Sequence, residues 1–111
     1  MNTLSTHVLD TMHGRPAAGL ALTLTGPHGE IARVSTNEDG RCPELIQGPL
    51  APGRYALRFA VAAYFRAQGV ELPNPPFLDE VSVDFGIADD GGHYHVPLLV
   101  SPFSYSTYRG S

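Results

Sequence analysis

The sequence predicts an all-β protein, a β-sandwich of about eight short strands with one short helix. Apolar and polar residues alternate with period two in several stretches, which places successive side chains on opposite faces of a strand. Glycine (12) and proline (10) together make up 22 of the 111 residues, so turns are frequent, as in folds with many short strands. Only one stretch has the composition of a helix.

The first third of the chain contains three predicted strands. Residues 3–10 alternate between two faces, so that His7 lies on the face opposite Val8. Residues 20–25 alternate leucine with alanine or threonine, which is typical of a half-buried strand. Residues 30–36 are expected to form its partner strand across a short loop.

Turn-forming residues separate these strands. Residues 13–16 and 26–29 contain glycine and proline, and their histidines, His13 and His28, are expected only to be exposed. Residues 37–40 read Asn-Glu-Asp-Gly. In such a turn the Asn and Asp side chains can bond their own backbone, and the glycine accepts a positive φ.

The middle of the chain contains a short strand and the one predicted helix. Residues 41–53 are rich in proline and glycine, so any strand there is short. Residues 54–61 alternate again, with apolar side chains directed inward. Residues 60–68 lack glycine and proline and end at Gly69, a typical C-terminal stop. A helix of about two turns forms only when it packs against the rest of the fold.

Three further strands are predicted in the last third. Residues 78–87 alternate, and residues 89–92 read Asp-Asp-Gly-Gly, a hairpin signal. We therefore expect residues 93–100 to pair back with the preceding strand, and residues 103–108 to form the final strand. Pro97 lies within this pattern and cannot donate a ladder hydrogen bond, which predicts an edge strand or a bulge there.

Composition bounds the class of protein. The 111 residues correspond to a single domain, residues 1–111. The net charge is −4 and the seven basic residues, all arginine, are scattered, which argues against a nucleic-acid partner. No apolar run approaches the ~20 residues of a membrane span, and no signal peptide is evident. We expect a cytoplasmic protein without membrane contact. The one cysteine, Cys42, forms no intrachain disulfide.

A few polar residues are candidates for chemistry. His7 lies in the middle of a strand, His93 and His95 share one face of another, and Arg41 follows a tight turn. Each also has a plainer interpretation as a solvated or hydrogen-bonded surface residue. Residues 108–111, Tyr-Arg-Gly-Ser, are harder to explain in that way. Chain ends usually fray, whereas here an apolar strand runs directly into the terminus.

A metal site is a weaker hypothesis. His7, His93 and His95 could supply three ligands, the number that a catalytic zinc site requires. Cys42 has no CxxC partner, which excludes a structural zinc finger. A nucleophile elbow, a phosphate-binding glycine loop and an HExxH helix are all lacking from the sequence. We therefore expect neither a metal nor a cofactor.

Four segments of the sequence carry a family resemblance. They are Leu-Ser-Thr-His-Val-Leu-Asp at 4–10, Thr-Asn-Glu-Asp-Gly-Arg at 36–41, His-Tyr-His-Val-Pro-Leu-Leu at 93–99, and Tyr-Ser-Thr-Tyr-Arg-Gly-Ser at 105–111. With the loop at 73–77, they make the chain resemble the 5-hydroxyisourate hydrolases, transthyretin-like enzymes of purine catabolism. The terminal tetrapeptide is the most specific element, because transthyretin, the hormone carrier with the same fold, lacks it.

The resemblance implies an architecture. The fold would be a transthyretin-like β-sandwich of two antiparallel sheets, with eight strands and one short helix. It also implies a homotetramer, a dimer of dimers, with a central channel and sites where the dimers meet. Pairing of exposed strand edges between subunits fits the edge strand predicted at Pro97.

The resemblance also implies an activity, the ring-opening hydrolysis of 5-hydroxyisourate to 2-oxo-4-hydroxy-4-carboxy-5-ureidoimidazoline. The family's catalytic residues correspond to His7, Arg41 and His95. Its substrate-binding residues correspond to His7, Arg41, Tyr108, Arg109, Gly110 and Ser111. His93 has no counterpart among them.

These residue types suit that chemistry. Imidazoles titrate near neutrality, so His7 and His95 can share the roles of general base and acid, and the residues alone do not assign which is the base. Arg41 is permanently charged and can bind a planar, carbonyl-rich ring and stabilise an oxyanion. Ser111 is expected to hydrogen-bond the substrate rather than attack it, since no third group orients a base towards it.

A non-enzymatic carrier is the alternative function, because the same fold can bind a small apolar hormone in its channel and a fold does not determine function. The residues at the channel mouth discriminate the two. Histidine, arginine and tyrosine there favour hydrolysis, whereas small apolar residues favour ligand storage.

Overall fold

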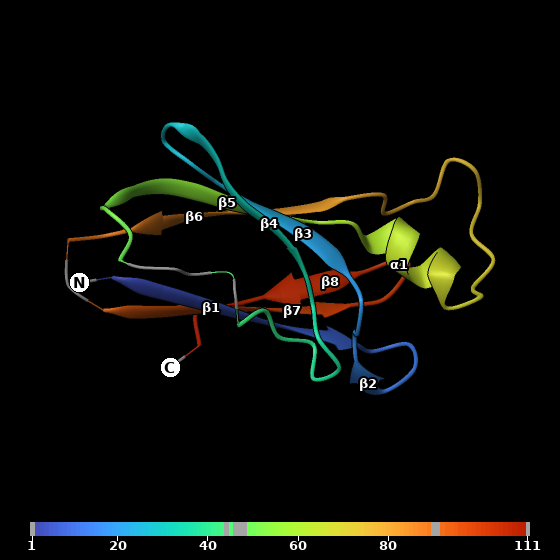
Figure 1. Ribbon diagram of the computed structural model, residues 1–111. Coiled ribbons are helices and arrows are strands. Elements are labelled where there is room, and N and C mark those ends of the chain that lie inside the picture. The colour runs from blue at the N-terminus through green and yellow to red at the C-terminus, as the bar shows by residue number, and fades with distance from the viewer. Residues whose placement is uncertain (1, 44, 46–48, 90–91, 111) are drawn as a thin grey trace.

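Two four-stranded sheets pack face to face in the computed structural model, which describes residues 2–43, 45, 49–89 and 92–110 (Figure 1). One sheet has the strand order β2-β1-β7-β8 and the other β4-β3-β5-β6. The strands are β1 Thr3–Asp10, β2 Arg15–Pro16, β3 Ala21–Gly26, β4 Gly29–Ser35, β5 Gly53–Phe59, β6 Val81–Ile87, β7 His93–Val100 and β8 Tyr105–Thr107. The predicted all-β sandwich with one short helix is confirmed.

The helix and most strand bounds agree with the sequence pattern. Helix α1 spans Val61–Ala67, and Gly69 follows it with a φ of +84°. The segment predicted as a turn at residues 13–16 contains the two-residue strand β2. Strand β6 begins at Val81, later than the alternation suggested. In the part of the chain that the structure describes, no helix has both the length and the apolar character to cross a membrane.

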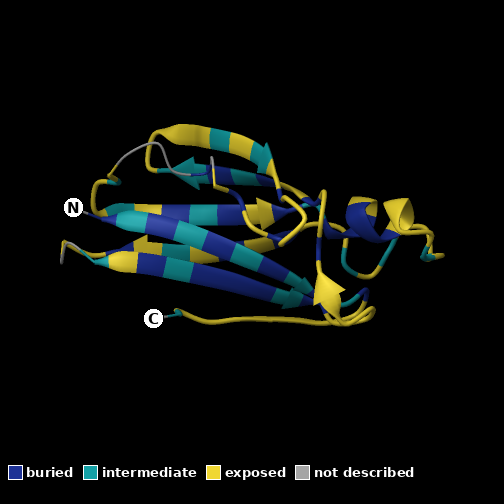
Figure 2. Cartoon of the chain, turned by 60° about the horizontal axis from the view of Figure 1, so that its bottom comes forward, coloured by how far each residue is buried: buried dark blue, intermediate teal, exposed yellow. Residues whose placement is uncertain are grey.

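The alternating burial of the strands builds one core between the sheets (Figure 2). In β1 every second residue from Leu4 to Asp10 is buried, and the intervening residues are half-buried. The interior is formed by fully buried side chains from both sheets, among them Val8, Leu24, Leu57, Phe59 and Leu98. The faces expected from period-two alternation are therefore correct.

Strands β1 and β7 run parallel, unlike the other pairs, so the sheets are not wholly antiparallel. Their register places Ser5 beside His95 and His7 beside Pro97. The whole second sheet lies between these two strands in the sequence, and the chain re-enters the first sheet from the same end at which β1 began (Figure 1). This register brings residues about ninety positions apart onto one face.

The hairpin predicted at residues 89–92 is wrong in its pairing. Strand β6 lies in one sheet and β7 in the other, so the connection carries the chain across the sandwich. Strand β7 pairs with β1 and β8 instead. Asp90 and Gly91 lie outside the described residues. An Asp-Gly signal reverses the chain direction, but it does not determine whether the next strand bonds to its predecessor or lies across the core.

Pro97 does not mark an edge, because β7 is an interior strand and its register with β1 is unbroken. The missing N–H donor of Pro97 instead affects the pairing of β7 with the segment on its other side, β8 and the residues that follow it. The pairs Leu98–Thr107 and His95–Gly110 belong to one antiparallel register, but the ladder is interrupted between them, opposite Pro97. Proline thus separates β8 from the chain end without disturbing β1.

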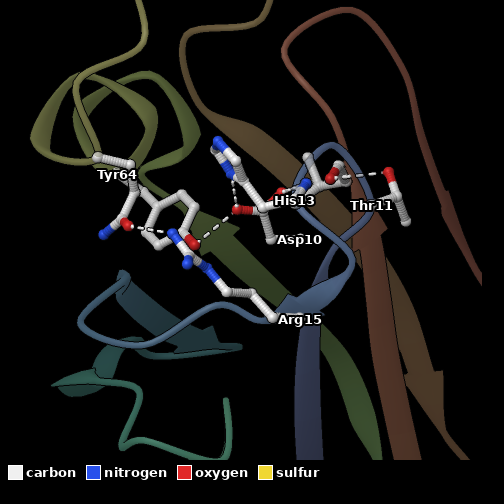
Figure 3. A network of polar contacts seen from close by, with 7 residues as sticks. Asp10, Thr11, His13, Arg15 and Tyr64 are labelled. Carbon is white, nitrogen blue, oxygen red and sulfur yellow. Dashed lines mark hydrogen bonds and ion pairs between the residues drawn. The ribbon is translucent and has the colours of Figure 1, made fainter.

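A buried polar network ties the end of β1 to helix α1 (Figure 3). The Asp10 carboxylate is 1% exposed and accepts hydrogen bonds from the Tyr64 hydroxyl at 2.8 Å and the His13 backbone N–H at 2.9 Å. Oδ2, the oxygen that accepts from Tyr64, also lies 2.6 Å from His13 Nδ1, whereas the His13 N–H bonds Oδ1. His13, expected only to be exposed, is therefore part of a structural contact.

Candidate active site

The candidate site lies on the outer face of the β2-β1-β7-β8 sheet. His7 comes from β1 and His95 from β7, and both are half-buried. Their neighbours Val8 and Val96 point the other way, into the core. The core residues thus fix the two backbones, and the alternation of the strands directs both imidazoles outward.

The turn at residues 37–40 places Arg41 next to His7. Its first residue, Asn37, accepts the backbone N–H groups of Asp39 and Arg41 on Oδ1, at 2.9 and 3.0 Å. Gly40 has a φ of +75°, and its carbonyl accepts the Val8 N–H at 2.8 Å. A Cβ at Gly40 would lie 2.4 Å from the Val8 carbonyl oxygen, so only glycine allows this approach. An isolated antiparallel bridge then pairs Arg41 with His7.

The chain end lies against His95. The Gly110 N–H donates to the His95 carbonyl at 2.7 Å, and an isolated bridge pairs the two residues. A Cβ on Gly110 would lie 2.6 Å from Cδ2 of the His95 ring. The backbone of Gly110 therefore touches the imidazole, and the position has no room for a side chain. Gly110, the last residue that the structure describes, therefore packs against His95.

The other residues of the terminal tetrapeptide lie differently. The Arg109 guanidinium stacks 4.0 Å above the ring of Tyr94, a residue of the inward face of β7, and donates to the His93 carbonyl at 3.3 Å. Tyr108 is 60% exposed. Both line a pocket of about 430 Å³ at the open side of the sandwich, between β6 and β8. Ser111 lies outside the described residues.

The surroundings of His95 favour its neutral form. Burial lowers the pKa of His95 below its ordinary value, and the positive charge of Arg41 and the neighbouring His7 and His93 lower it further. A neutral imidazole near pH 7 has a lone pair available to accept a proton. Burial first, and then the charge of Arg41, therefore disfavour the protonated form of the His95 ring.

Sequence reasoning missed the contacts that two hydroxyl residues make with His93 and His95. Ser5 Oγ lies 2.7 Å from His95 Nδ1 and 2.9 Å from His93 Nε2, and Thr3 Oγ1 lies 2.6 Å from His93 Nδ1. All four residues alternate outward on β1 and β7. The alternation was visible in the sequence, but the parallel register that pairs the strands was not.

The three-histidine metal hypothesis gains no support. Both ring nitrogens of His93 and Nδ1 of His95 are engaged with Thr3 and Ser5. Among the residues that the structure describes, no three His, Cys, Asp or Glu side chains gather as metal ligands would.

The fold and the outward imidazoles together define a transthyretin-like sandwich that carries a polar site on one sheet. The chain belongs to the HIUase/Transthyretin family, whose model matches residues 4–110. It is 56% identical over 117 residues to a protein of Ralstonia nicotianae named 5-hydroxyisourate hydrolase, and the match covers 100% of both chains.

Two solved structures show the same fold. The structure of Klebsiella pneumoniae 5-hydroxyisourate hydrolase is 39% identical, with a TM-score of 0.87 and 100% of each chain covered. Sea bream transthyretin, solved in complex with thyroxine, is 32% identical, with a TM-score of 0.84. That match covers 96% of this chain and 93% of the transthyretin chain. The family thus contains proteins named for hydrolysis and a protein solved with a bound hormone.

Proposed function

We propose that this protein hydrolyses 5-hydroxyisourate, opening its ring to give 2-oxo-4-hydroxy-4-carboxy-5-ureidoimidazoline. One observation carries the proposal: one chain brings His7, Arg41, His95 and the backbone of Gly110 together on one face of a sheet. The full-length similarity to 5-hydroxyisourate hydrolases supports it. A carrier pocket has no need of a neutral imidazole beside a guanidinium.

His95 is the general base in this mechanism. Its lowered pKa leaves the ring neutral at pH 7, and the bond between Nδ1 and Ser5 leaves Nε2 available to substrate. A water oxygen bonds to a ring carbonyl carbon while Nε2 takes the water proton. The ring C–N bond then breaks, and the departing nitrogen takes a proton, for which His7 is the acid. General acid–base groups contribute typically ~10²–10⁴-fold each.

Arg41 stabilises the developing charge. Its side chain is exposed and its backbone is fixed beside His7, so the guanidinium can meet a planar carbonyl-rich ring from the solvent side. A fixed cation aimed at an oxyanion is commonly the largest single contribution to such catalysis. Substrate contacts by Tyr108, Arg109, Gly110 and Ser111 belong to the same proposal.

The homotetramer is also part of the proposal. Strands β6 and β8 are edge strands of the two sheets and border the same open side of the sandwich. Edge strands offer unpaired backbone groups to a second copy. The nearby aromatic side chains of Tyr105 and Tyr108 are 46% and 60% exposed. Light scattering on the purified protein tests the assembly, and cell fractionation tests the cytoplasmic location that we propose with it.

The activity is tested by following the ultraviolet absorbance of freshly generated 5-hydroxyisourate. We expect the purified protein to accelerate its decay and to yield the ring-opened product by mass spectrometry. A decay rate equal to that in buffer would contradict the proposal. In a parallel arm, calorimetric titration with thyroxine tests the carrier alternative. Stoichiometric binding without acceleration would replace the hydrolase with that function.

A further inference from the structure

We infer that His93 is a positioning residue for the hydrolysis, acting through Ser5 to orient His95 and to connect it with solvent. This inference rests on the proposed function. His93 is exposed and lies at the start of β7, two residues before His95. It touches no part of the proposed reaction directly, and its effect would pass entirely through the Ser5 hydroxyl.

The geometry is a continuous chain of four side chains. Thr3 Oγ1 lies 2.6 Å from His93 Nδ1, His93 Nε2 lies 2.9 Å from Ser5 Oγ, and Ser5 Oγ lies 2.7 Å from His95 Nδ1. The parallel register places Thr3 beside His93 and Ser5 beside His95. Thr3 and Ser5 of β1 thus each lie next to an imidazole of β7, and Ser5 joins the two rings.

The chain permits two consistent proton arrangements. In the first, His95 Nδ1–H donates to Ser5, Ser5 donates to His93 Nε2, and His93 Nδ1–H donates to Thr3. His95 Nε2 is then bare and can act as a base. In the second, every donor is reversed: Thr3 donates to His93 Nδ1, His93 Nε2–H to Ser5, and Ser5 to His95 Nδ1. His95 then carries its proton on Nε2. A hydroxyl that both donates and accepts makes this reversal possible.

Proton transfer along the chain converts one arrangement into the other. When His95 Nε2 takes a proton from water, Nδ1 passes its own proton to Ser5 Oγ, and Ser5 passes its proton to His93 Nε2. The proton on His93 Nδ1 leaves through Thr3 to solvent. One proton enters at His95 and one leaves at His93, so the balance is kept.

The charges that face His95 favour this direction. Arg41, His7 and His93 face the ring from the turn, from β1 and from β7. The chain end places the uncharged backbone of Gly110 against His95 and the Arg109 guanidinium 3.3 Å from the His93 carbonyl. A positive neighbour disfavours an imidazolium, so a proton taken up by His95 is readily passed on. His93 is exposed and can release it to water.

The test compares four variants with wild type across pH 5 to 9, with kcat and KM measured separately. His93→Ala and Ser5→Ala interrupt the chain, His93→Gln retains a polar group near Ser5, and His28→Ala is the control. His28 is an exposed histidine in the β3–β4 turn. We expect His93→Ala and Ser5→Ala to lower kcat on the order of tenfold and to change KM little, and His28→Ala to leave both unchanged. His93→Ala and Ser5→Ala should also shift the acid limb of the profile, with partial rescue by His93→Gln.

Two further readouts separate this proposal from simpler ones. The double variant Ser5→Ala/His93→Ala should be no slower than Ser5→Ala, because both break one chain. Nitrogen-15 NMR of the His95 ring should show the tautomer with its proton on Nδ1 in wild type, which leaves Nε2 bare, and a mixture of tautomers in Ser5→Ala; a wild-type ring with its proton on Nε2 would contradict the proposal. Folding is checked by circular dichroism.

The outcomes are distinguishable. A wild-type protein without activity contradicts the proposed function, and the NMR comparison then still tests the positioning of His95. An active wild type whose His93→Ala variant retains kcat and the same pH profile overturns the role of His93. Additive losses in the double variant also overturn it.

Discussion

At the residue scale, the chemistry depends on how one imidazole is surrounded. His95 is half-buried, hydrogen-bonded through Nδ1 and faced by a permanent positive charge. Burial and Arg41 both disfavour its protonated form, and Ser5 bonds Nδ1, which leaves Nε2 for the proposed role as base. These three contacts allow the ring to act as a base at neutral pH.

Removing the guanidinium should raise the pKa of His95. In Arg41→Gln the backbone bridge to His7 remains, but the positive charge that disfavours the imidazolium is lost. NMR titration of the His95 ring should therefore give a higher pKa than in wild type. Arg33→Gln, which removes a charge on the exposed strand β4, is the control. An unchanged or lower pKa in Arg41→Gln would contradict the electrostatic account.

Substituting the three proposed catalytic residues should abolish most of the activity without unfolding the protein. His7→Asn, Arg41→Gln and His95→Asn are each expected to lower kcat/KM on the order of 10²-fold or more. All three side chains lie on the outer sheet face, so thermal unfolding should change little. A variant with near-wild-type kcat/KM would remove that residue from the mechanism.

At the element scale, two segments without regular structure complete the site. The turn at residues 37–40 carries Arg41 to β1, and the chain end carries Gly110 to β7. Each approach depends on a glycine, because a Cβ would meet Val8 at Gly40 and His95 at Gly110. The strands supply the imidazoles, and these two segments place the guanidinium and the terminus beside them.

Adding one methyl group to the chain end should disturb His95. In Gly110→Ala the new Cβ would lie 2.6 Å from His95 Cδ2, so the ring or the terminus must move. Displacements of about 1 Å in a site can cost up to ~10²-fold in rate. We expect kcat to fall at least tenfold by that reasoning. His28→Ala, in the exposed β3–β4 turn, should keep its activity. Equal activity in both variants would show that the contact is not needed.

At the scale of the whole molecule, the fold that holds the site is stabilised by a polar network where β1 meets helix α1. Asp10 ends β1 within the core and bonds to His13 and to Tyr64 of α1 (Figure 3). Burial raises the pKa of this carboxyl, but the hydrogen bonds from His13 and Tyr64 outweigh it and leave the pKa lowered. Burial, and after it the hydrogen bond to Asp10, raises the pKa of Tyr64 to about 12.

This network predicts a pH-dependent stability. A carboxyl whose pKa is lowered by folding stabilises the protein above its unfolded pKa, near 3.8, and loses that contribution as the pH falls through the folded value. Asp10→Asn should therefore lower the free energy of unfolding by about 1–3 kcal/mol at pH 7. Urea unfolding should show this difference shrinking below pH 4. The exposed Asp79→Asn is the control, and a pH-independent difference would contradict the account.

The local features of this fold were predictable, and the long-range ones were not. Period-two alternation gave the outward faces of His7 and His95, and Gly40 marked a turn with positive φ. The edge strand predicted from Pro97 and the hairpin pairing predicted from residues 89–92 were wrong, because a missing N–H donor or a turn signal does not identify the neighbouring strand. The link between Ser5 and His93 depends on a parallel register between distant strands, which no local pattern encodes.

The most direct test of the account is the pH dependence of kcat/KM for wild-type hydrolysis of 5-hydroxyisourate. The account predicts acceleration over buffer with an acid limb whose apparent pKa lies below 6.5, the ordinary value for histidine. Such a limb would report the protonation of a base whose charged form is disfavoured by burial and by Arg41. A profile whose acid limb has an apparent pKa at or above 6.5, or a rate no faster than buffer at any pH, would contradict it.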